Sequence, residues 1–321
     1  MHERDAILAL WNQSETSVLA TVVEVRGSAY RRPGARMLLT NDGRSAGVIN
    51  GGCLDGDLHA RAQIVLETRQ AQLAVYDTTS NQDIVFGLGL GCRGVVKILL
   101  EPARNLDFLR ENKVVEVVFE GDNLGSRLHE ASFEGRPQII ETAEGRAFIE
   151  TLEAPQPLFI FGAGADVVPL DNIGRAVGWN VQILDLRSPS PSRMTFVEAT
   201  HLAPENLSQL EIPDGAACVI MTHNFLHDLE LLKHLLPSSA AYIGILGPRR
   251  RTDELLEKLG SESLLSGISP SQSQLERLFA PIGLDLGAET PEEIALSIVA
   301  EIQKVKRTKS GASLREKPTI H

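Results

Sequence analysis

Two cysteines that follow glycines are the residues best suited to bind a metal or a ligand. Cys53 ends the run Gly51-Gly52-Cys53, and Cys92 lies in the run Gly91-Cys92-Arg93-Gly94. Each is expected in an exposed loop at a strand end, where backbone N–H groups gather and can bind anions. Zinc is not indicated, because a zinc site needs four ligands and neither cysteine has a Cys-x-x-Cys partner or a close histidine. The alternative is that both cysteines simply fill tight turns.

A glycine turn between a predicted strand and a predicted helix is the second chemical signal. Gly162-Ala163-Gly164 follows the apolar run 159–161 and precedes a helix expected over residues 167–177. The start of a helix at such a turn can bind phosphate, and Asp185, about 20 residues further on, would bond ribose hydroxyls. Val167 stands where G-x-G-x-x-G has its third glycine, which weakens the match. A site for a phosphate-bearing ligand and a Rossmann-type turn without a ligand both remain open.

Arginines and one histidine are candidates for binding the same kind of anion. Arg31 and Arg32 lie in a glycine-rich loop, and Arg249 and Arg250 begin a predicted helix after a buried strand. Guanidinium groups match phosphate with paired hydrogen bonds. His223 follows a predicted strand, at the edge where open α/β sheets bind ligands. For Arg31 and Arg32 the alternative is a solvated hairpin face.

The elements that position these residues follow different patterns in the two parts of the chain. The first part is predicted to hold helices over residues 3–12 and 54–69 and short strands over residues 17–25, 35–40, 46–49, 95–100 and 114–119. The second part alternates strand and helix. Its strands are expected over residues 158–161, 180–184, 217–221 and 241–246, and its helices over residues 167–177, 226–236 and 249–259. Thr290-Pro291-Glu292-Glu293 is a capping box that begins a last helix.

This organisation predicts the α/β class. We expect an N-terminal α/β domain with the glycine–cysteine loops over residues 1–152, and a C-terminal Rossmann-like domain with a parallel sheet over residues 153–306. The prolines of residues 153–157 suit a linker. Residues 307–321 are polar and mixed, and are expected to be a disordered tail.

Composition restricts the classes of partner. The formal net charge of −11 argues against binding to nucleic acid or to an anionic membrane surface. No apolar run is long enough for a transmembrane helix, and the charged start does not resemble a signal peptide. Three cysteines in 321 residues do not make a disulfide framework, so a reducing, cytoplasmic location is expected.

Four blocks of sequence carry a resemblance to a known family. They are GSAYRRPGARMLLTNDGRSAGVINGGCLDGD over residues 27–57, GLGLGCRG over residues 87–94, FIFGAGADVVPL with LDLR after it, and a last group of MTHNFLHDLELL, YIGILGPRRR and PIGLDLGAETPEEIALSIVAEI. The chain resembles the XdhC/CoxI family, accessory proteins for molybdenum hydroxylases such as xanthine dehydrogenase and carbon monoxide dehydrogenase. The resemblance covers most of the chain apart from residues 101–155 and the tail.

The resemblance implies a maturation chaperone and not a turnover enzyme. Such a protein binds the molybdenum cofactor (molybdopterin, or its dinucleotide form), protects it during sulfuration and passes it to the apo molybdenum hydroxylase. Cys53 and Cys92 would then contact the metal end of the cofactor, because soft thiolates suit molybdenum. The arginines would neutralise phosphate, and the glycine turn would take the pterin phosphate or an added nucleotide. A cysteine desulfurase is a further candidate partner, and a homo-oligomer is expected.

The chain departs from the family pattern at the glycine turn. Ala165 stands where the family has a histidine, and Asp166 is expected to repel a phosphate there. Two other functions therefore stay in view. An NAD(P)-dependent oxidoreductase would use the Rossmann-like domain, with His223 as the sole acid–base candidate beside the turn. A scaffold that only docks the hydroxylase and a sulfur donor would need neither cysteine.

Overall fold

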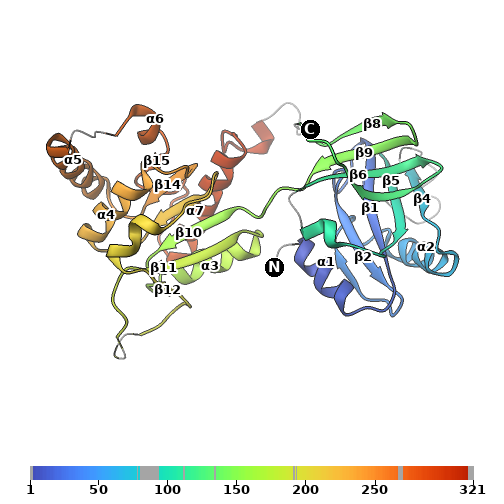
Figure 1. Ribbon diagram of the computed structural model, residues 1–321, viewed down its shortest axis with the longest axis horizontal. Coiled ribbons are helices and arrows are strands. Elements are labelled where there is room, and N and C mark those ends of the chain that lie inside the picture. The colour runs from blue at the N-terminus through green and yellow to red at the C-terminus, as the bar shows by residue number, and fades with distance from the viewer. Residues whose placement is uncertain are drawn as a thin grey trace. The chain divides into compact units, whose positions relative to one another are not determined.

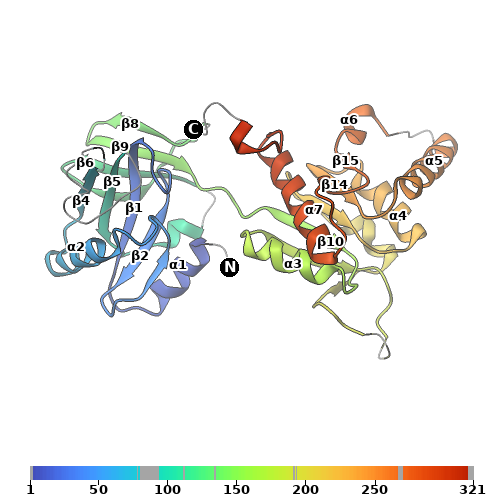
Figure 2. The same ribbon diagram turned by 180° about the vertical axis from the view of Figure 1, so that it is seen from behind.

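The computed structural model describes residues 3–77, 79, 94–110, 113–133, 135–190, 192, 194–266 and 270–316, without the side chains of residues 262–266. The chain divides into two compact units, Met1–Ala154 and Pro155–His321. The division falls within the predicted linker. Figures 1 and 2 show both units from opposite sides.

The N-terminal unit contains a five-stranded antiparallel sheet in the described residues, with the order β3-β2-β1-β5-β4. Its elements are α1 (Glu3–Asn12), β1 (Ser17–Gly27), β2 (Arg36–Thr40), β3 (Ser45–Gly47), α2 (Asp55–Thr68), β4 (Gln72–Asp77) and β5 (Gly94–Pro102). A 3-10 helix (Asp107–Arg110) connects this sheet to a four-stranded antiparallel sheet. That second sheet is formed by β6 (Val114–Gly121), β7 (Gly125–Leu128), β8 (Gln138–Thr142) and β9 (Gly145–Thr151), in the order β7-β6-β9-β8.

Strand β1 lies at the centre of this unit and is buried on both faces. Val18 and Ala20 pack against α2, whereas Leu19 and Val23 pack against α1 and the second sheet. The continuous apolar run of β1 reflects these two cores, because alternate residues of a strand point to opposite faces. The sequence therefore predicts the strand without revealing which element covers each face.

The ends of β1, β3 and β4 lie at one end of the five-stranded sheet, beside the starts of β2 and β5. Gly27, the last residue of β1, pairs with Gly94, the first residue of β5. Asp77, the last residue of β4, pairs with Val95, and β3 ends at Gly47 beside the beginning of β2. The connections over residues 28–35 and 48–54 therefore start or finish at this end, so the topology places the Cys53 segment there.

The C-terminal unit is a Rossmann-like domain. Its six described strands are parallel, in the order β12-β11-β10-β13-β14-β15, which is the 3-2-1-4-5-6 order of dinucleotide-binding sheets. The elements are β10 (Pro157–Phe161), α3 (Val167–Ala176), β11 (Asn180–Asp185), β12 (Thr200–His201), β13 (Ala217–Ile220), α4 (Phe225–Leu235), β14 (Tyr242–Ile245), α5 (Arg249–Ser266), α6 (Gln272–Leu275), β15 (Leu278–Phe279) and α7 (Pro291–Lys306), with 3-10 helices at Pro204–Gln209 and Leu314–Glu316.

Helices cover both faces of this sheet, as predicted. Helices α3 and α7 lie side by side on one face, as Figure 2 shows, and α4 and α5 pack on the other. The strands are short and almost wholly buried, which explains their unbroken apolar runs. The reversal of strand order lies between β10 and β13, and their carboxyl ends lead to Gly162 and to His223.

Three boundaries differ from prediction. Strand β3 ends at Gly47, two residues earlier than expected, because Gly47 has a positive φ of 86° and turns the chain. Helix α5 continues to Ser266 instead of ending near residue 259. The tail was predicted to be disordered, but Leu314–Glu316 form a 3-10 turn after Lys309 caps α7 by donating its N–H to the carbonyl of Lys304. None of the helices among the described residues has the length and apolar character needed to cross a membrane.

A buried ion pair joins the two sheets of the N-terminal unit. Nη1 of Arg36, on β2, lies 2.6 Å from Oε1 of Glu150, on β9, and both side chains are buried. The variant Glu150→Ala is expected to lower the free energy of unfolding by about 3 to 5 kcal/mol, because it leaves the Arg36 charge buried without its partner. Glu230→Ala, in the exposed pair with Lys233, should cost less than about 1 kcal/mol. Chemical denaturation measures the free energy of unfolding of both variants. Equal losses of stability would contradict the larger contribution assigned to the buried Arg36–Glu150 pair.

Candidate functional site

The Cys53 loop is organised by a single buried amide. Oδ1 of Asn50 accepts hydrogen bonds from the backbone N–H groups of Gly52 (2.6 Å) and Leu54 (3.2 Å), and Nδ2 donates to Asp55 (2.9 Å) at the beginning of α2. Gly52 has φ +99°, a conformation that favours glycine. The loop therefore has a defined shape, and it leaves Cys53 exposed directly before α2.

The loop over residues 28–34 packs against the Cys53 loop. The ring of Tyr30 covers Gly51, and Arg31 donates to the carbonyl of Val48 at 2.7 Å. Arg31 also forms a paired ion bridge with Glu3 of α1, at 3.0 and 2.8 Å, and this pairing raises the pKa of its guanidinium. The phosphate-binding role of Arg31 stays a prediction, and in this structure its donors hold α1 and the loop together. Arg32 is exposed.

The second cysteine segment lies outside the described residues. This applies to Gly91 and Cys92, whose predicted roles stay predictions. Gly94, two residues after Cys92, is described and closely contacts the backbone carbonyl of Ser28. The loop over residues 28–34 therefore contacts both the start of β5 and the Cys53 loop.

At the glycine turn a carboxylate already occupies the start of α3. Gly162 has φ +133°, and a side chain there would collide with the carbonyl of Met221 after β13. The Asp166 carboxylate lies against Gly164, and its Oδ2 accepts a hydrogen bond from Nε2 of His223 at 2.8 Å. Phosphate binding by Gly162 and Gly164 stays a prediction, and a bound phosphate would meet the negative group that covers the turn.

Asp185 lines a hollow of about 310 Å³ beside this turn, together with Ala163 and His201. Its carboxylate is held by Arg187, with N···O distances of 2.8, 3.1 and 2.8 Å, and this pairing raises the pKa of Arg187. Asp185 thus lies at the expected edge of the sheet. A ribose hydroxyl would have to share the carboxylate with Arg187.

The three arginines after β14 do not act as one group. Arg249 and Arg250 are exposed at the beginning of α5, and Arg250 lies 3.5 Å from Glu254. Arg251 turns inward and bonds the buried carboxylate of Asp228 at 2.6 Å, and that carboxylate also accepts a hydrogen bond from Thr222. This cluster fixes α4 against α5. Across the described residues, no three His, Cys, Asp or Glu side chains are grouped closely enough to hold a metal ion.

Comparison with known proteins identifies the family. Residues 158–302 match the XdhC Rossmann domain, and residues 10–77 match the XdhC and CoxI family. A relative from Bacillus subtilis (strain 168), described as a probable xanthine dehydrogenase subunit, is 33% identical, over 93% of this chain and 96% of that protein. The chain belongs to the XdhC and CoxI family.

Two further similarities agree with this assignment. The crystal structure of a xanthine dehydrogenase from Bacillus halodurans is 30% identical and superposes with a TM-score of 0.74, over 99% of this chain and 98% of that one. The molybdenum cofactor insertion chaperone PaoD of Escherichia coli (strain K12) is 24% identical, over 94% of this chain and 87% of PaoD. Similarity to XdhC and CoxI proteins thus extends over both units.

Asn50 belongs to the Cys53 loop, and it was not named as a candidate from the sequence. Its amide makes the turn that presents Cys53, and an asparagine directly before two glycines is a recognisable signal for such a turn. Asp166 and Asp185 were expected at the edge of the C-terminal sheet, but their pairing with His223 and Arg187 was not predicted. His223 and Asp166 are 57 residues apart, so no local pattern reveals their pairing.

Cys53 and Cys218 are expected to differ strongly in reactivity. Cys218 lies within β13, and burial raises the pKa of its thiol to about 12. At pH 8 only about one Cys218 side chain in 10,000 is then a thiolate, the reactive form. Brief treatment with iodoacetamide should label Cys53 and leave Cys218 intact until the protein unfolds. Peptide mass spectrometry checks this, and equal labelling of both in the native protein would refute the assigned burial.

Proposed function

We propose that this chain is a chaperone for the molybdenum cofactor. In this proposal it binds the cofactor as cargo, supports its sulfuration, and delivers it to an apo hydroxylase of the xanthine dehydrogenase or carbon monoxide dehydrogenase type. The observation that carries the proposal is the exposed Cys53 thiol on the Asn50 loop, in a chain related along most of its length to an insertion chaperone. The partners proposed with it are the apo hydroxylase and a cysteine desulfurase.

The chemistry of the N-terminal loops suits this cargo. A thiol is a soft donor, which fits molybdenum better than the carboxylates elsewhere in the unit. Cys53 is accessible and held on an ordered turn, and we assign Cys92 the same role. Gly52 and Gly91 would allow the cofactor to approach the backbone. We assign Arg32, an exposed arginine of this loop, to the pterin phosphate.

A chaperone must also release its cargo. We therefore expect a dissociation constant on the order of micromolar, or about 8 kcal/mol. An affinity far tighter than this would trap the cofactor. Exposure of the thiol is consistent with exchange, because the apo hydroxylase can approach the same face of the loop.

An NAD(P)-dependent oxidoreductase is the second candidate. The strand order of the C-terminal sheet and the hollow beside Asp185 favour a nucleotide there, and Arg249 and Arg250 are exposed at a nearby strand end. Asp166 counts against it, because its carboxylate lies where a pyrophosphate would bind. His223, the acid–base candidate, is committed to Asp166.

The test is anaerobic capture of the cofactor by the purified protein. The protein is incubated with cofactor released from a denatured molybdoenzyme and then passed through gel filtration. Molybdenum and the fluorescent oxidised pterin are expected to elute with the protein, and NADPH is not. Elution of NADPH without molybdenum or pterin would reject the chaperone and favour the oxidoreductase.

A further inference from the structure

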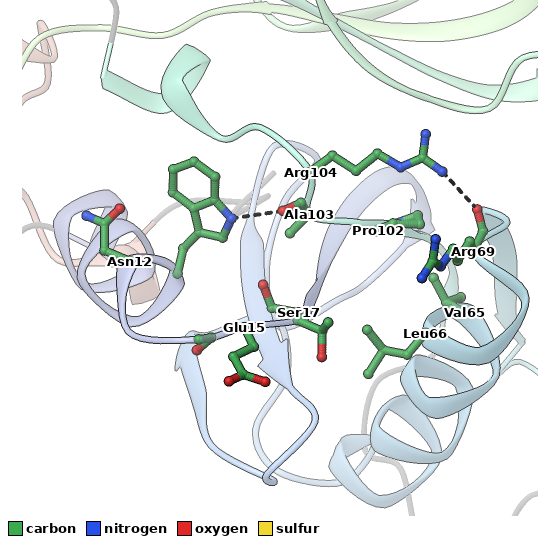
Figure 3. A pocket seen from close by; sticks show the side chains of 12 residues that line it. Asn12, Glu15, Ser17, Val65, Leu66, Arg69, Pro102, Ala103 and Arg104 are labelled. Carbon is green, nitrogen blue, oxygen red and sulfur yellow. Dashed lines mark hydrogen bonds between the residues drawn. The ribbon is translucent and has the colours of Figure 1, made fainter.

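The N-terminal unit contains a pocket of about 670 Å³ at the end of the sheet opposite the Cys53 loop. Ser17, the first residue of β1, and Pro102, the last residue of β5, line it. Figure 3 shows the pocket between the end of α1, which contributes Asn12, and the end of α2, which contributes Leu66. Trp11 of α1 also lines it. Its volume is within the range of small-molecule sites.

One side of the pocket carries two arginines without acidic partners. Arg69 caps α2 and Arg104 follows β5, and neither forms an ion pair with any residue in the described part of the chain. Arg104 reaches across toward Arg69 and contacts its backbone carbonyl at 3.5 Å, as Figure 3 shows. In a chain of net charge −11, two neighbouring guanidinium groups form a local positive charge that attracts anions.

A second cavity, of about 340 Å³, borders the same two arginines, and its acidic residue does not neutralise them. Glu101 accepts hydrogen bonds from the N–H and hydroxyl of Ser126, at 2.8 and 2.5 Å. Burial raises the pKa of Glu101, and the hydrogen bonds from Ser126 direct its carboxylate toward β7. The arginines therefore keep their capacity to bind an external anion.

The rest of the pocket suits a ring with hydrogen-bond donors. Val65 and Leu66 form an apolar wall, and the indole of Trp11 is fixed by its hydrogen bond to the carbonyl of Ala103 at 2.8 Å. Glu15 lies on the side away from Arg104 in Figure 3. A carboxylate there accepts hydrogen bonds from N–H groups of a ligand and repels a second anionic group. The pocket thus has an anion end, an apolar middle and a donor-binding end.

We propose that this pocket is a second ligand site, separate from the Cys53 loop, for a small heteroaromatic compound that carries one phosphate or carboxylate group. The anionic group binds Arg69 and Arg104, the ring packs against Leu66, and amino or imino groups of the ring donate to Glu15.

Guanosine 5′-monophosphate is a suitable probe, because it joins a phosphate to a ring with N–H donors. Isothermal titration calorimetry with the full chain should detect it, with guanosine and inorganic phosphate binding at least about tenfold more weakly because each lacks one half of the recognition. The double variant Arg69→Ala/Arg104→Ala should lose at least about tenfold in affinity. Arg110→Ala, an exposed arginine of the same unit paired with Asp107, should leave binding unchanged.

Three results would overturn the proposal. They are equal binding of guanosine 5′-monophosphate and inorganic phosphate, unchanged affinity in the double arginine variant, and loss of binding on Arg187→Ala alone, which would assign the nucleotide to the C-terminal unit. A thermal denaturation curve matching the wild type verifies that the double variant is folded. Its capture of the molybdenum cofactor should also match the wild type, so failure here and failure of the proposed function are separate outcomes.

Discussion

Replacing Cys53 and Cys92 together by serine is expected to weaken binding of the molybdenum cofactor by about 100-fold, or about 2.7 kcal/mol. Serine preserves the size of each side chain but replaces a soft sulfur donor with a hard oxygen, which suits molybdenum poorly. The Cys53 loop itself should keep its shape, because Asn50 and not the thiol organises it. Molybdenum and pterin that co-elute with the protein after anaerobic incubation measure the loss.

Two controls make this result specific. Cys218→Ala also removes a thiol, but a buried one on β13, and should capture the cofactor like the wild type. Asn50→Ala keeps both thiols but orphans two backbone N–H groups of the loop, so it should reduce capture partially. If the double serine variant captures and delivers cofactor at wild-type levels, the chain acts as a docking scaffold and the proposed role of the cysteines is wrong.

The variant Asp166→Asn is expected to raise the affinity of the glycine turn for a phosphate-bearing nucleotide by about tenfold, or about 1.4 kcal/mol. The substitution removes a negative charge from the start of α3, where the N–H groups and the helix dipole favour an anion. Asparagine keeps the size of the side chain and can still accept the hydrogen bond from His223. Titration with ADP at low ionic strength measures the change, because salt screens it.

His223→Ala is the matched control for this second prediction. It removes the partner of Asp166 and leaves the carboxylate in place, so it should not increase the affinity for ADP. An equal increase in both variants would contradict the role given to the charge, because His223→Ala leaves the Asp166 carboxylate in place. No change in Asp166→Asn would show that the carboxylate does not limit binding, and the nucleotide site would then have to be sought elsewhere.

Much of the fold could be predicted from the sequence because its signals are local. The strands of the C-terminal unit are short apolar runs between glycines and helices, and Thr290 with Glu293 forms the capping box that begins α7. The alternation of strand and helix implies a parallel sheet, since a parallel connection needs a crossover helix. The two-unit organisation follows from the change of pattern at the proline-rich segment near residue 155.

The site was predicted less completely. Cys53 was correctly placed in an exposed loop, because glycines flanking a cysteine favour a turn. The prediction for Arg31 failed to account for Glu3, which is 28 residues away and belongs to α1. A cluster of arginines in the sequence indicates positive charge, but it does not reveal which of those charges the fold neutralises.

The sequence by itself determined the family, the Rossmann-like domain and the glycine–cysteine segments, because each depends on residues that are neighbours along the chain. Only the tertiary structure decided which charged groups are available. The pairs Arg36–Glu150 and Asp166–His223, and the pocket between the ends of α1 and α2, depend on how the strands are ordered and which helices cover them. Partners brought together over such separations leave no local pattern, since only the packing of the whole unit sets the distance between them.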